Sequence, residues 1–244
     1  MKKLLPLLLI LFCTNSEAAL VPSVLVTSSS NTDATSYTTA SITPASYALV
    51  IAVVYSRQAV GATTPTLTGN GITWVQEDTV DQGTNRRTTL FRGMVASPTT
   101  EAVTIDFAGN TQTACGWLIS QITGADTSGV DGAGAIVQNP TATTGTGTAS
   151  SLTLAAFQNP KNMAFAVHSK NNGTAYQPGT FTMLQQQLMT ENTQILNTQY
   201  QINKTAVSAS WSGSEAWECM AVEVKAKSED ITLYKSTLYK ASLF

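Results

Sequence analysis

Residues 101–124, EAVTIDFAGNTQTACGWLISQITG, decide the fold class because they contain two strand patterns joined by a polar turn. In the first pattern Val103, Ile105 and Phe107 alternate with polar residues, which is the period of two that a half-buried strand shows. Residues 108–111, AGNT, follow it, and Gly and Asn tolerate the positive φ that a tight reversal needs. The stretch therefore predicts a pair of antiparallel strands.

The second strand pattern is apolar on both of its faces, with Cys115, Trp117 and Ile119 on one face and Leu118 on the other. A strand with two apolar faces lies in the middle of a sheet. Residues 47–55, YALVIAVVY, have the same character. We therefore expect two central strands from these segments.

Short strand patterns bounded by Gly, Asn, Pro and Ser recur through the rest of the chain, and no convincing helical periodicity interrupts them. About a dozen strands at hairpin spacing indicate an all-β protein, specifically a two-sheet antiparallel β-sandwich of jelly-roll type. No change of composition divides residues 19–227, so we expect one β-sandwich domain there.

The first 18 residues have the pattern of a secretory signal peptide. Two lysines precede the apolar run of residues 4–12, and residues 16–18, SEA, offer a cleavage site between small residues. The apolar run is about half of the roughly 20 residues that a membrane-spanning helix needs. We therefore expect a signal peptide at residues 1–18, a secreted or cell-surface protein, and no transmembrane segment.

The composition is poor in charge, because charged residues form 11% of the chain and the formal net charge is -2. That balance supplies neither a basic field for nucleic acid nor a polybasic patch for a membrane surface. Thr, Ser, Asn and Gln must cover most of the surface, as is common in secreted β proteins. We therefore expect no nucleic-acid partner.

The C-terminal tail, residues 228–244, has a different pattern. Leu-Tyr-Lys occurs at residues 233–235 and again at 238–240, a spacing of five that matches neither a strand nor a helix. One interpretation is a frayed tail. The other is an apolar segment that docks on a neighbouring subunit or a membrane protein, because a free tail usually lacks such Leu and aromatic content.

Two cysteines, Cys115 and Cys219, remain once the predicted signal peptide and its Cys13 are removed. An even number of cysteines in an oxidising compartment is compatible with a disulfide bond. Each of the two also lies beside a tryptophan in a strand pattern, where a buried cysteine often behaves as a small apolar residue. A disulfide and two buried thiols therefore both remain open.

The chain offers little for catalysis. His168 is its single histidine; no nucleophile motif accompanies it, and we expect a partly exposed surface residue near the end of its strand. Glu218 and Glu223 are five positions apart and should point to opposite faces of one strand, which argues against a shared two-carboxylate site. The sequence therefore predicts a protein that is not an enzyme.

A calcium ion is the one cofactor that the sequence suggests. Residues 126–134, DTSGVDGAG, form a Gly-rich loop in which Asp126 and Asp131 are candidate metal ligands, since β-sandwich modules often fix a loop with calcium through carboxylates. The alternative is that these aspartates only close Asx turns.

Exposed aromatic side chains are the best candidates for ligand binding, because they stack on sugar rings. Trp211 precedes Ser-Gly-Ser at the end of a strand pattern and is the first candidate, and Tyr176 in the loop of residues 171–179 is the second. Trp117 and Trp217, beside the cysteines, are expected in the core.

Three segments carry a resemblance to a known module. Residues 69–80 (GNGITWVQEDTV), 86–129 (from RRTTLFRGMVASP to TACGWLISQITGADTSG) and 211–226 (WSGSEAWECMAVEVKA) resemble an uncharacterised β-sandwich module of phage-encoded and bacterial secreted proteins. The resemblance rests on turns, tryptophans and a closing strand. It implies a sandwich carried on virion or cell-surface proteins and brings no catalytic residues.

Together these patterns predict a non-enzymatic extracellular module that binds a surface ligand, above all a glycan, through strand-end loops or one sheet face. Such a module would serve adhesion to carbohydrate. The alternative is a structural protein that assembles into a coat, filament or virion appendage, because a low-charge, Thr-rich surface allows subunits to pack closely.

Overall fold

A computed structural model describes residues 18–228 except 60, 140–141, 172–174 and 190–193. The regular secondary structure of the described chain is all β apart from one short 3-10 helix, η1 (Ala133–Ala135). In chain order the strands are β1 (Val21–Ser30), β2 (Ser36–Thr38), β3 (Leu49–Arg57), β4 (Thr66–Thr68), β5 (Val75–Gln82), β6 (Arg86–Gly93), β7 (Thr104–Asp106), β8 (Ala114–Thr123), β9 (Ile136–Gln138), β10 (Thr143–Thr153), β11 (Met163–Lys170), β12 (Thr182–Met189), β13 (Gln194–Ile202) and β14 (Ala206–Val224). The prediction of an all-β antiparallel sandwich is confirmed.

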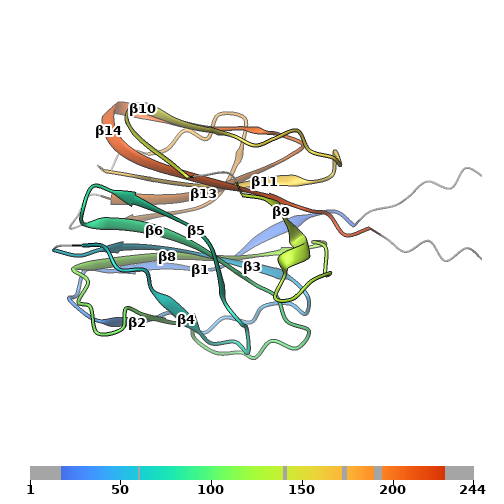
Figure 1. Ribbon diagram of the computed structural model, residues 1–244, viewed down its shortest axis with the longest axis horizontal. Coiled ribbons are helices and arrows are strands. Elements are labelled where there is room, and N and C mark those ends of the chain that lie inside the picture. The colour runs from blue at the N-terminus through green and yellow to red at the C-terminus, as the bar shows by residue number, and fades with distance from the viewer. Residues whose placement is uncertain (1–17, 60, 140–141, 172–174, 190–193, 229–244) are drawn as a thin grey trace, which may run out of the picture.

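The strands form three layers (Figure 1). The middle layer is a five-stranded sheet in the order β1-β8-β3-β6-β5, and the three-stranded sheet β2-β7-β4 packs on one of its faces. A six-stranded sheet, β10-β14-β11-β13-β12 with β9 beside β14, packs on the other face. The structure thus adds a third layer to the predicted two-sheet sandwich.

The middle sheet is buried on both faces, which explains the apolar runs in β3 and β8. In β3, Val50 and Val54 face the three-stranded sheet, whereas Ile51 and Val53 face the six-stranded sheet. All four side chains are at most 1% exposed. A strand in this position needs apolar residues at consecutive positions, so the two predicted central strands are confirmed.

The first eight strands follow a jelly-roll order. One sheet contains β1-β8-β3-β6 and the facing sheet contains β2-β7-β4, and the chain passes back and forth between them. The departure from the pattern is β5, which pairs with β6 in the middle sheet instead of extending the three-stranded sheet. Strands β9 to β14 then build the six-stranded sheet from the second half of the chain alone.

The ribbon formed by β10 and β14 bends sharply and folds over the outer face of its own sheet (Figure 1). The pairing register shifts between Gly147 and Ala149, and Gly213 in the opposite strand takes a φ of 91°, which strains any residue with a Cβ. Leu152 and Val207 from the folded part consequently pack on the outer face of β11. The apolar side chains on this outer face therefore form a second, small core, which we call the outer core.

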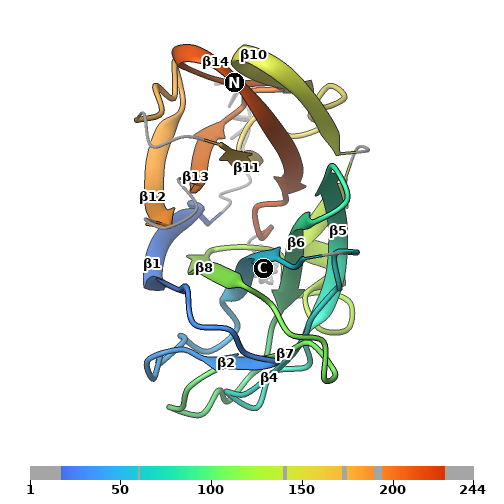
Figure 2. The same cartoon turned by 90° about the vertical axis from the view of Figure 1, so that its left-hand side faces the viewer.

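The middle sheet meets the six-stranded sheet edge to edge on one side of the molecule. There β1 lies along β12 (Figure 2), and Gln187 Nε2 donates to Ser29 Oγ at 3.1 Å.

The first and last parts of the described chain lie side by side at one end of the molecule, where the Ala18 N–H donates to the Lys227 carbonyl at 3.1 Å. The predicted signal peptide and tail lie almost wholly outside the described residues. Among the described residues no helix has the length and apolarity that crossing a bilayer requires.

Candidate functional site

The structure brings together the two aromatic residues that the sequence suggests as ligand-binding. Trp211 lies where the β10–β14 ribbon bends, and Tyr176 lies in the loop after β11. Their ring centroids are 5.5 Å apart at an angle of 81°, an edge-to-face contact. The Lys170 ammonium, at the end of β11, lies 5.5 Å from the Tyr176 ring and 5.7 Å from the Trp211 ring, within the range of a cation–π contact.

The predicted exposure of these two rings is wrong. Trp211 is 6% exposed and Tyr176 is 2% exposed, because the folded ribbon and the loop after β11 cover the outer face of the sheet. The Trp211 Nε1–H donates to the Gly147 carbonyl at 3.0 Å, so its polar atom has an internal partner. The rings therefore pack the small outer core and present no open face for a sugar.

His168 lies in the same outer core and is fully buried, contrary to the expected surface position. Its Nε2 accepts from the Gln199 amide at 3.0 Å, and that amide also donates to the Ser208 carbonyl. Its Nδ1 then carries the proton and donates to Ser150 Oγ at 2.7 Å. Burial lowers the pKa of His168 to about 3, so the neutral ring is a weak base, and the nitrogen that faces Ser150 already carries the proton.

Glu218 in β14 faces the opposite way, into the core between the middle and the six-stranded sheets. Its carboxylate is 1% exposed, and Thr88 of β6 donates to Oε2 at 2.5 Å. Burial raises the pKa of Glu218 to about 7, although the hydrogen bond from Thr88 lowers it in part. Its other oxygen, Oε1, has no hydrogen-bond partner.

Glu218 is the strongest candidate for a titrating group near neutral pH, since a pKa of about 7 suits a general acid or base. Glu223 forms a separate network, in which Asn162 donates to its Oε1 at 2.6 Å and Gln138 donates to its Oε2. The prediction that these two glutamates do not share a site is confirmed. The sequence signal for Glu218 was its alternation with Met220 and Val222, both of which face the core.

The loop with the proposed calcium ligands is held by protein groups. Asp126 Oδ2 lies 2.6 Å from the Lys225 ammonium, and Asp126 Oδ1 accepts from the Ser128 N–H at 2.7 Å. Burial opposes ionisation of Asp126, but these partners hold its pKa below the usual value. Asp131 adopts a left-handed φ of 52°. The described residues contain no group of three or more potential ligands, and calcium binding stays a prediction.

The two cysteines lie on opposite sides of the central core, so of the two open alternatives the disulfide bond does not form. Cys115 packs between the middle and three-stranded sheets, and Cys219 packs under the folded ribbon on the outer face of the six-stranded sheet. Both are free and at most 1% exposed. Burial raises the pKa of each thiol, so the alternative of two buried, unreactive thiols holds.

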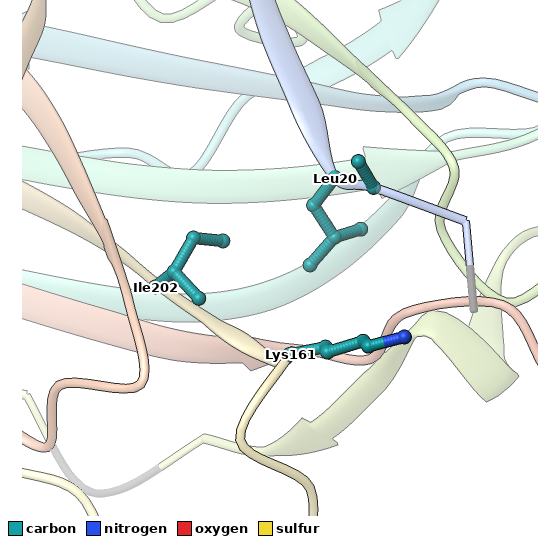
Figure 3. Close-up of a pocket in the computed structure, with 4 residues that line it drawn as sticks. Leu20, Lys161 and Ile202 are labelled. Atoms are coloured by element: carbon teal, nitrogen blue, oxygen red, sulfur yellow. The ribbon is translucent and has the colours of Figure 1, made fainter. Parts of the chain in front are cut away.

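A small open pocket lies at the end of the molecule where the described chain begins and ends. Ala19, Leu20, Lys161 and Ile202 line a volume of about 210 Å³. Figure 3 shows the Leu20 and Ile202 side chains directed into the space, with Lys161 along its edge. The pocket is apolar apart from this one ammonium, and it suits an apolar side chain rather than a polar substrate.

Comparison of the chain with protein-family models, with curated proteins and with solved structures found no match.

Proposed function

We propose that this chain is a non-enzymatic extracellular structural module that assembles with copies of itself through the free edge of β10. The observation that carries the proposal is the lack of charge at that edge. Among the described strands β10 pairs only with β14, and none of its 11 residues, TTGTGTASSLT, is charged.

An edge strand exposes unpaired N–H and C=O groups, and proteins usually protect such an edge with lysine, proline or a bulge. β10 has one bulge, after Gly147, and a run of strand on either side of it. The exposed side chains along β10 are all small, namely Thr144, Thr146, Thr148, Ala149, Ser151 and Thr153. A second backbone can therefore approach without desolvating any charge.

The non-enzymatic part of the proposal is supported by the burial of His168 and Glu218, the histidine and the carboxyl group with large pKa shifts. His168 and Glu218 are 0% and 1% exposed, and a substrate would have to displace a sheet layer or the folded ribbon to reach either one. Proton transfer requires direct contact or one intervening water.

The test is the mass of the purified protein by light scattering over a wide concentration range. We expect assemblies that grow with concentration, and we expect Thr146→Lys to abolish them by placing an ammonium on the edge. Thr182→Lys is the matched control, because Thr182 is an exposed residue of β12, which lies along β1. A monomer at every concentration, or equal loss with both variants, would overturn the proposal.

Ligand binding is a second candidate, favoured by one exposed aromatic residue. Tyr47 is 56% exposed in the loop before β3, which is a strand-end loop of the kind that a binding module uses. Tyr47→Ala should abolish retention on a glycan matrix while leaving the melting temperature unchanged. Retention that survives this change, or no retention of the unaltered protein, would contradict glycan binding through this loop.

A further inference from the structure

The apolar pocket of Ala19, Leu20, Lys161 and Ile202 lies beside the point where the chain leaves the described structure. Ala18, the residue before the pocket-lining Ala19, is hydrogen-bonded by its backbone to Lys227. The pocket has an apolar interior, and its lining residue Ile202 is 38% exposed. Covering this apolar surface with an apolar side chain removes it from water, which is favourable.

The chain itself supplies such a segment. Residues 229–244, EDITLYKSTLYKASLF, contain two Leu-Tyr pairs and a Leu-Phe pair, and they begin two positions after Lys227, whose carbonyl accepts from Ala18 beside the pocket. We propose that residues 229–244 dock on this pocket of the same chain and place the Leu233 side chain in it.

The distance allows this contact. Leu233 is six positions after Lys227, and six extended residues reach about 20 Å, which far exceeds the two backbone steps between the Lys227 hydrogen bond and the pocket lining. A short tether also keeps the local concentration of the segment in the mM range. The same chain therefore has a large advantage over a segment from another molecule.

Size and charge agree with the proposed occupant. A volume of about 210 Å³ accommodates one Leu or Tyr side chain. The first two residues of the segment, Glu229 and Asp230, are acidic, and Lys161 lies at the edge of the pocket (Figure 3). An ion pair between one of these acidic residues and Lys161 would be weak in water, but the opposite charges are compatible with the proposed contact.

The test is disulfide trapping in the full chain, with Cys13→Ser to remove the thiol of the predicted signal segment. Cys115 and Cys219 are buried and should not react. One variant combines Ile202→Cys with Leu233→Cys. The matched control combines Val21→Cys with Leu233→Cys, because Val21 is exposed, lies two positions from Ala19 and does not line the pocket.

Under mild oxidation we expect the Ile202 variant to form an intramolecular disulfide about tenfold faster than the Val21 control, because burial of Leu233 favours the docked state by at least that factor. The bond is located by mass spectrometry of non-reduced peptides. Equal rates would show a segment that samples the surface without docking, and disulfide-linked dimers would show that the occupant comes from a second copy. Either result overturns the proposal, and neither depends on assembly through β10.

Discussion

Glu218→Gln tests the central electrostatic conclusion, that a buried carboxyl lowers the stability of this protein at neutral and alkaline pH. The variant keeps the size of the side chain, and its amide oxygen still accepts from Thr88 Oγ1. It removes the charge that burial disfavours. We therefore expect Glu218→Gln to be more stable than the unaltered protein above pH 7 and equal to it at low pH.

The magnitude follows from the pKa of Glu218, which rises from 4.5 to about 7 on folding. Between these values the folded protein keeps a proton that the unfolded chain has released, so the free energy of unfolding falls as pH rises through this range. At 1.36 kcal/mol for each pH unit, the full loss is roughly 3 kcal/mol. The side chain is 1% exposed, so solvent screens little of it.

The assay is urea unfolding of both proteins at pH 4 and at pH 8. We expect the difference in unfolding free energy to grow from about zero at pH 4 to roughly 3 kcal/mol in favour of the variant at pH 8. Glu101→Gln is the control at an exposed glutamate, and its effect should stay below about 1 kcal/mol at both pH values. A difference that is the same at pH 4 and pH 8, or a variant that is less stable at pH 8, would refute the reasoning.

Three further predictions concern the other buried groups. The pKa of His168 falls from 6.5 to about 3 on folding. The neutral ring therefore stabilises the fold above pH 6.5, and this contribution is lost as the pH falls toward 3. His168→Gln should flatten that part of the acid-unfolding curve, measured by circular dichroism. Trp211→Ala should cost about 3–5 kcal/mol in thermal unfolding, whereas an unchanged melting temperature would mean that the ring is exposed. Cys115 and Cys219 should resist iodoacetamide in the native protein and both react in denaturant without reductant; a single disulfide-linked species would contradict the structure.

The alternation of residues along the chain predicts which side chains share a strand face, and this part of the fold was accessible from the sequence. Residues 47–55 and 115–122 have apolar residues on both faces, and both segments became central strands. The same alternation predicts that Glu218 and Glu223, five positions apart, point to opposite faces of their strand. A period of two is a property of the extended backbone, so it needs no knowledge of tertiary contacts.

The alternation of side chains along a strand does not predict which layer will cover each face of that strand. Trp211 and Tyr176 follow patterns of exposed residues at strand ends, and His168 stands near the end of its strand. All three are buried because the β10–β14 ribbon bends at Gly147 and folds over its own sheet. Whether the ribbon folds over its own sheet or stays extended depends on contacts between distant parts of the chain, and no local sequence pattern predicts the outcome.

The sequence by itself therefore determined that the protein is all-β, which two strands are central, and which side chains share a strand face. These features depend on the order of residues along one strand. Only the tertiary structure decided that there are three layers, that Cys115 and Cys219 lie in different cores, and that Glu218 is enclosed between two sheets. The physical reason is that burial of a face depends on the layer that covers it, and the residues of that layer come from distant parts of the chain.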